Sequence, residues 1–344
     1  MNTGLVEKIA DAMLYEGYLL YPYRSSAVKN RQRFNFGVLY PRRHCDLQLG
    51  SDSWEMRTEC LVTGSASTTI EVKVRFLQLG TRQERDTVPA GRSLVAETGA
   101  AASDESRLKA GCSQDWLPHK WQEGRERDVS TSACNVGAIE ARPHRQQFVF
   151  AGAEDLEGRV MQTLHGELEL GALPLDESCY RVTLNIRNLA DIEDAENLSR
   201  DQVLLRSLVS VHSILHVAGG EFVSLLDPPE EFKAAAIGCQ NAGAWPVLAG
   251  DEGQRNLVLS APIILYDYPQ IAPESAGDLF DGCEIDEILA LRILTMTDAE
   301  KLEVRNGDDR ARQILERTEL LPPEHFQKLH GALRGLRMSP EGPQ

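Results

Sequence analysis

The chain has 344 residues, a formal net charge of -16 and a hydrophobic content of 42%. This length can bury a substantial core without a structural metal or a disulfide framework, and it favours one large domain or two modest ones. The composition is typical of a soluble globular protein and excludes a largely disordered chain, while no stretch reaches the roughly 20 apolar residues that span a bilayer.

The charge is unevenly distributed along the chain. Residues 1–150 hold 20 Lys or Arg and 18 Asp or Glu, so the remaining 194 residues hold 16 and 34. An acidic field of this size repels phosphate, which argues against general nucleic-acid binding through the second part.

The expected location is cytoplasmic. Charged residues from Glu7 to Glu16 interrupt the opening segment, so it lacks the apolar core of a signal peptide. The seven cysteines include no CxxC pair, and their odd number favours reduced thiols over a disulfide framework.

The N-terminal part predicts a helix followed by a basic aromatic segment. Apolar residues recur at helical spacing over residues 3–20, and Pro22 ends the pattern. Between Gly17 and Cys45 there are six Lys or Arg and no Asp or Glu.

The middle of the chain predicts an antiparallel sheet, as a sandwich or a partly open barrel. Apolar and charged residues alternate within 54–79, most clearly over Ile70–Phe76, and again over 147–150, 167–170 and 180–186. Residues 81–128 contain few apolar runs, which indicates a long loop between strands or a pair of marginal elements.

Residues 199–217 predict a buried helix capped by Ser199, because apolar residues cover every face at helical spacing. His212 and His216 stand four apart on this helix, a spacing at which two imidazoles share a metal ion, and Glu221 follows. The alternative is that both histidines are hydrogen-bonded core residues.

The C-terminal part predicts one strand and several helices. Leu257–Tyr268 contains an apolar run typical of a buried strand, whereas helices are expected over 284–296, from Thr297, and within 308–337. We therefore expect an α+β fold, with a β-rich domain over 1–195 that includes the N-terminal helix, an α-rich part over 196–338 packed on it, and a disordered tail over 339–344.

The basic aromatic segment is the strongest candidate for a partner-binding surface. Aromatic rings and arginine contribute disproportionately to protein interfaces, although the same chemistry binds single-stranded nucleic acid. Internal pairing of the arginines with the acidic C-terminal part is an equal alternative, and the acidic chain makes a protein partner the better hypothesis than nucleic acid. The candidate partner-binding residues are Tyr21, Tyr23, Arg24, Lys29, Asn30, Arg31, Arg33 and Phe34.

No fingerprint of an enzyme family is present, since GxSxG, P-loop and GxGxxG patterns are all missing from the sequence. A metal-dependent or thiol enzyme that uses His212, His216 or Cys239 stays an alternative. Cys239 precedes a flexible turn, but no base is placed beside it by sequence. We expect no cofactor.

Three long motifs carry a resemblance to a known family. They are YEGYLLYPYR at 15–24 followed by KNR at 29–31, GGEFVSLLDPP at 219–229, and SAPIILYDYPQIAPES at 260–275. With these motifs the chain resembles uncharacterised bacterial proteins encoded beside high-affinity, oxygen-insensitive nickel-iron uptake hydrogenases.

The resemblance implies an accessory function, in which the protein helps to assemble, mature or stabilise a hydrogenase through protein contacts. It supplies no catalytic residue. The sequence also lacks the paired CxxC motifs that a nickel-iron large subunit needs, so the chain is expected to serve the enzyme rather than to oxidise hydrogen.

Overall fold

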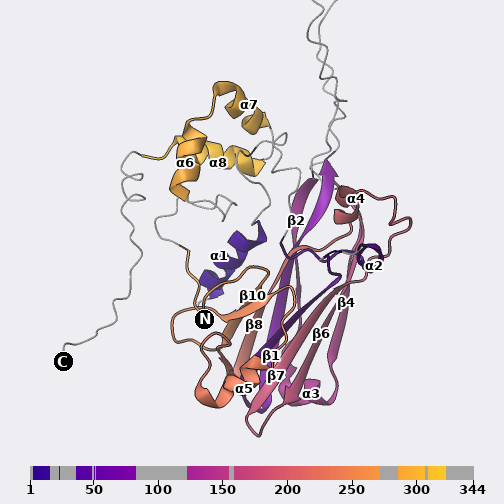
Figure 1. Cartoon of the computed structure of the whole chain (residues 1–344), viewed down its shortest axis with the longest axis vertical. Coiled ribbons are helices and arrows are strands. Elements are labelled where there is room, and N and C mark those ends of the chain that lie inside the picture. Colours follow the sequence, from indigo (N-terminus) through magenta and orange to yellow (C-terminus); the bar gives the residue numbers. More distant parts are fainter. Residues whose placement is uncertain are drawn as a thin grey trace, which may run out of the picture.

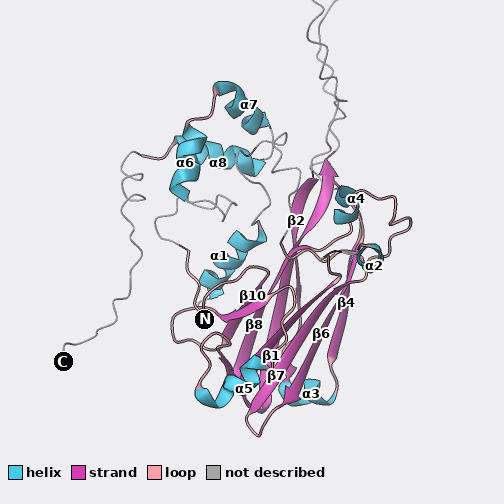
Figure 2. Ribbon diagram, viewed as in Figure 1, coloured by secondary structure: helices cyan, strands magenta, loops and turns pink. Residues whose placement is uncertain are grey.

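The fold is built on one large antiparallel sheet, shown in Figures 1 and 2. The computed structural model describes residues 3–15, 23, 36–48, 50, 52–82, 122–154, 159–271, 286–306 and 309–322. The sheet consists of β1 (Glu55–Arg82), β2 (Gln122–Ser130), β3 (Cys134–Asn135), β4 (His144–Phe150), β5 (Arg159–Met161), β6 (Leu164–Pro174), β7 (Cys179–Asn188), β8 (Val209–Val223), β9 (Trp245–Leu248) and β10 (Leu257–Ala261).

The main path through the sheet runs β4-β6-β7-β1-β8-β10-β9, and β2, β3 and β5 also pair with β1. Ten antiparallel strands and several helices confirm the predicted α+β class. The finer prediction of a sandwich or a partly open barrel stays a prediction.

The helices are α1 (Thr3–Leu14), α2 (Arg42–Leu47), α3 (Val136–Ala141), α4 (Arg200–Leu204), α5 (Lys233–Ile237), α6 (Asp286–Leu294), α7 (Asp298–Asn306) and α8 (Asp309–Glu319), with a short 3-10 helix η2 (Glu230–Phe232). Figure 1 shows α6, α7 and α8 grouped together near the end of the sheet that carries β2. No helix within the described ranges is long and apolar enough to cross a membrane.

β1 organises the sheet because both of its edges are paired along most of its length. Its first part pairs with β7, and its second part pairs with β8 on one edge and with β2 on the other. The register against β8 shifts between Gly64 and Thr69 and again between Arg75 and Leu77, so the pairing of the two strands is interrupted at these points. The alternation over Ile70–Phe76 correctly predicted this strand, since Ile70, Val72, Val74 and Phe76 are all buried.

The largest core cluster lies along one side of the sheet. Phe76 of β1 contacts Phe148 and Phe150 of β4, with ring centroids 5.8 and 5.7 Å apart. Gly166 of β6 pairs with Phe148, and a Cβ added at Gly166 would lie 2.1 Å from the Phe148 ring. The cluster therefore joins strands that are separated in the path through the sheet, and only glycine fits beneath the Phe148 ring.

Two further clusters fix the helices to the sheet. Val6, Ile9, Ala10 and Met13 of α1 pack with apolar residues of β9 and β10. Residues of α6, α7 and α8 share another cluster with the end of β1 and with α4. The described helices at both ends of the chain are thus held by burial of apolar surface.

The predicted buried helix over 199–217 is wrong beyond its first turn. Ser199 does cap α4 through a capping box with Gln202, but α4 ends at Leu204 and β8 begins at Val209. β8 lies between β1 and β10. A central strand that is covered on both faces is apolar throughout, and periodicity cannot separate such a strand from a buried helix.

The apolar run Pro262–Tyr266 is not the buried strand that the sequence predicted. β10 ends at Ala261, and the Ile264 and Tyr266 side chains beyond it are 76% and 87% exposed. Near the C-terminus, the capping box predicted at Thr297 is confirmed, since Thr297 and Glu300 exchange backbone-to-side-chain hydrogen bonds at the start of α7.

Candidate functional site

The basic aromatic segment lies mainly outside the described residues. Seven of its eight candidate partner-binding residues fall there: Tyr21, Arg24, Lys29, Asn30, Arg31, Arg33 and Phe34. Tyr23 is described and is buried with a positive φ of 57°, in the same apolar cluster as Tyr15 and Leu77. Its ring therefore contributes to the core of this chain.

The candidate metal ligands His212, His216 and Glu221 lie on β8 and not on a helix. Four residues of strand span about 13 Å, so two imidazoles at this spacing cannot share an ion as they do on a helix. His216 Nδ1 lies 3.9 Å from Glu71 Oε2, and Glu221 is exposed. In the ranges that the structure describes, no three His, Cys, Asp or Glu side chains are grouped closely enough to hold a metal ion.

His212 is a fully buried histidine of the core. Its Nδ1 donates to the Ser210 carbonyl at 2.9 Å, which places the proton of the neutral ring on that nitrogen. Nε2 is buried and has no hydrogen-bond partner among the residues that the structure describes. Burial is the largest cause that lowers the pKa of His212 to about 4, and the nearby Arg75 guanidinium lowers it further. The ring is therefore neutral at physiological pH.

A polar network beside His212 connects α1, the sheet and α8. Arg75 Nη2 donates to Asp11 of α1 at 2.6 Å and lies 3.6 Å from Glu126 of β2. The Tyr15 hydroxyl donates to Glu126 at 2.6 Å, and the Arg310 guanidinium lies over the Tyr15 ring at 3.3 Å. The two arginines and the two carboxylates balance in charge, and their contacts join α1 and α8 to the sheet.

Cys239 lies in a loop that is anchored to β1 by Glu59. The Glu59 carboxylate is almost completely buried and accepts hydrogen bonds from Arg57 and from the Gln240 amide. Asn241 pairs with the Glu59 backbone at 2.7 and 3.2 Å, much as a neighbouring strand would. Burial is the largest cause that raises the pKa of the Cys239 thiol. The thiol is therefore protonated at neutral pH, which disfavours a nucleophilic role.

Two of the motifs that carry the family resemblance meet in the fold. The Ser224 hydroxyl, in 219–229, donates to Asp267 Oδ2, in 260–275, at 2.5 Å. The same hydroxyl accepts from the amides of Leu226 and Asp227. Asp267 Oδ1 accepts from the Leu248 amide of β9 at 2.8 Å. The Asp267 carboxylate thus links the 219–229 motif, its own 260–275 motif and the edge strand β9.

Residues 262–271, which we call the edge loop, cover part of the free edge of β9. The Tyr268 amide donates to the Leu248 carbonyl at 2.7 Å, so the loop uses backbone groups that an incoming strand would otherwise pair with. Away from this contact, the loop exposes Ile264 and Tyr266. Trp245 of β9 is opposite Ala261 at the start of the loop and is 43% exposed.

The exposed side chains of the edge loop and β9 are of kinds that occur in protein interfaces. Large aromatic and aliphatic side chains held on a well-ordered scaffold are the residues that contribute most to interfaces.

No protein-family model matches the chain, and a comparison with curated proteins found no match.

Proposed function

We propose that this chain is a non-catalytic accessory protein that acts through protein-protein contacts, and that it serves the assembly, maturation or stabilisation of a nickel-iron hydrogenase. One observation carries the interaction role. Asp267 fixes the edge loop to β9 and to Ser224, while Ile264 and Tyr266 stay exposed on it. The choice of hydrogenase depends on the resemblance of the 15–24, 219–229 and 260–275 motifs.

An interaction through the edge loop is favoured because exposure of the apolar Ile264 and Tyr266 side chains to water is unfavourable. Burial of a side chain the size of isoleucine contributes about 1.5–3 kcal/mol, and a partner that covers the edge loop gains this free energy. The loop is already fixed by three hydrogen bonds, so a partner need not order it, and less binding free energy is lost to conformational entropy.

The enzyme alternative has less support from the geometry. His212 is fully buried, His216 lies four residues further along β8, about 13 Å away, and burial raises the pKa of the Cys239 thiol. His212 and His216 lie apart on β8 and Cys239 lies in a loop after α5, so these three candidates do not form one reaction site.

Affinity capture tests the proposal in a hydrogen-oxidising host. The tagged full-length protein should recover a hydrogenase subunit or maturation factor, and an Ile264→Ser/Tyr266→Ser double variant should recover much less. Val149→Ser is a matched control, since Val149 is 59% exposed on β4, at the other edge of the sheet. Equal recovery by the double variant would refute the role of the edge loop.

Deletion of the gene tests the hydrogenase assignment separately. We expect lower hydrogenase activity and unchanged growth on organic substrates. Unchanged hydrogenase activity in the deletion strain would refute the assignment, even if the edge loop were shown to bind another protein.

A further inference from the structure

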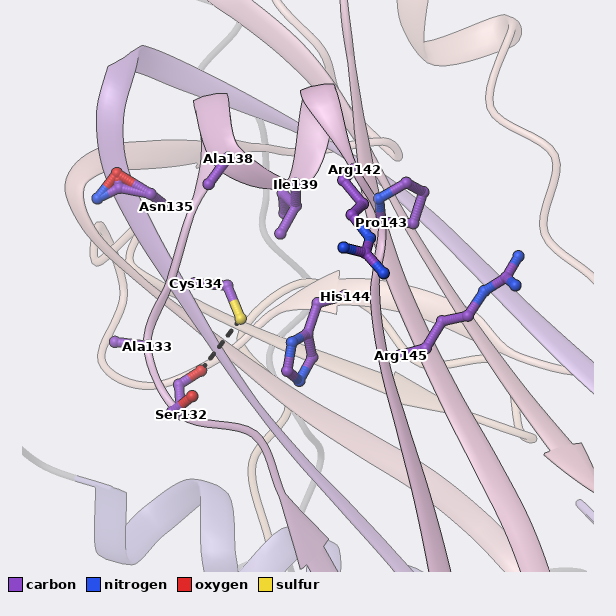
Figure 3. Close-up of a pocket in the computed structure, with 10 residues that line it drawn as sticks. All are labelled: Ser132, Ala133, Cys134, Asn135, Ala138, Ile139, Arg142, Pro143, His144 and Arg145. Atoms are coloured by element: carbon purple, nitrogen blue, oxygen red, sulfur yellow. Dashed lines mark hydrogen bonds between the residues drawn. The ribbon is translucent and has the colours of Figure 1, made fainter.

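A basic groove lies between α3 and the start of β4. It has a volume of about 740 Å³ and is lined by ten residues, which Figure 3 labels. This volume falls within the range of small-molecule sites. Its lining residues come from the segment that runs through β3 and α3 into β4, so the chain forms the groove from one continuous stretch.

The charge of the groove is opposite to that of the chain. Arg142, His144 and Arg145 line it, and none of the ten lining residues is acidic. Arg145 Nε donates to Glu169 at 2.8 Å, so this guanidinium already has a carboxylate partner. Arg142 is exposed and makes no ion pair with any residue in the described part of the chain. Figure 3 shows the Arg145 side chain extending away from the Arg142 and His144 side chains.

His144 adds an unsatisfied hydrogen-bonding group. Its Nε2 atom is buried and has no partner among the described residues. Such an atom is costly unless a ligand or an ordered water completes it. Cys134 and Ile139 supply a buried apolar side, while Asn135 and Ser132 supply exposed polar groups.

From these features we infer that the groove binds a small organic anion, in which a carboxylate or phosphate group pairs with Arg142 and His144 and an apolar part lies against Ile139. A guanidinium suits such an anion because it offers paired donors in one plane. The inference is independent of the hydrogenase assignment, since it concerns different residues and a different class of ligand.

Titrations of the full-length protein with benzoate, benzamide and inorganic phosphate test the inference. Benzoate should shift the NMR signals of His144 saturably, whereas benzamide, its neutral isostere, should not. A response to phosphate as well would show that the oxyanion suffices, and a response to benzoate alone would show that the apolar part is needed. Both results support an anion site. Absence of a saturable response to both anions, or equal binding of benzamide, would overturn it.

Two matched variants locate the site. Arg142→Gln should weaken benzoate or phosphate binding at least about tenfold, since a charged hydrogen bond contributes enough for that factor. Arg145→Gln should change it less than about threefold, because the Arg145 guanidinium is paired with Glu169. Arg142 is exposed, so its replacement should leave the thermal melting temperature unchanged. Equal binding by wild type and Arg142→Gln would overturn the assignment.

Discussion

Acid should destabilise this protein through the buried His212, and the structure predicts by how much. The pKa of the ring falls from 6.5 to about 4 on folding, because burial penalises the charged form and Arg75 repels it, while the Ser210 hydrogen bond and Asp11 oppose the shift only in part. The unfolded chain therefore binds a proton more readily than the folded chain. Stability is fully present above pH 6.5 and is lost as the pH falls toward 4.

The magnitude follows from the difference between the two pKa values. The linkage relation gives a loss of about 2 kcal/mol between pH 7 and pH 5, and of about 3 kcal/mol by pH 4. Most carboxylates titrate below pH 5, so the interval from pH 7 to pH 5 reports mainly on the eight histidines, and a His212 variant separates the contribution of that residue.

Urea unfolding at pH 7, 6 and 5 measures the effect in wild type and in His212→Asn. The amide nitrogen of asparagine can still donate to the Ser210 carbonyl, but the side chain does not titrate. The variant should lose some stability at every pH through lost volume, yet its stability should fall by about 2 kcal/mol less than that of wild type between pH 7 and pH 5.

His165→Asn is the matched control, since it makes the same substitution at an exposed position on β6, where no buried contact is lost. Parallel pH profiles for wild type and His212→Asn would refute the reasoning. So would an NMR titration of folded wild type that placed the His212 pKa near its ordinary value.

Three further changes test the packing and the hydrogen bonds. Phe76→Ala should destabilise the protein by about 3–5 kcal/mol in urea unfolding, because Phe76 is fully buried at the centre of the aromatic contacts; a loss below about 1 kcal/mol would contradict that placement. Glu59→Gln should cost about 1.5–3 kcal/mol by removing the charged acceptor of Arg57, and a neutral result would show that the pair contributes nothing. Asp267→Ala should lower both stability and partner capture, since it releases Ser224 and the edge loop; unchanged capture by the folded variant would separate the loop from the interaction.

Local patterns predicted β1, β4, β6 and β7, whereas the prediction of a loop over 81–128 is wrong from Gln122, where β2 begins. The alternation in β1 and β7 and the caps at Ser199 and Thr297 all agree with the structure. β8 was mistaken for a helix because its two buried faces remove the alternation, and the two-residue period then leaves no trace in the sequence. The length of the apolar run could not separate a strand from a helix, since β8 at 15 residues is longer than most strands.

The polar anchors could not be found from sequence. Glu59 and Asn241 are 182 residues apart, and Ser224 and Asp267 are 43 apart. Each residue by itself resembles an ordinary surface side chain. Only pairing across the sheet shows that Glu59 is buried and that Asp267 closes an edge, because burial depends on neighbours that are distant along the chain.

By itself, the sequence determined the α+β class, the position of β1, β4, β6 and β7 and the uneven charge, because these depend on composition and on local periodicity. The tertiary structure alone decided that His212 is an enclosed core residue on a strand, that Ile264 and Tyr266 are exposed, and that two distant motifs meet at Asp267. The physical reason is that a side chain acquires its solvation, its pKa and its partners from the elements packed against it, and strand pairing sets those elements together over long distances in sequence.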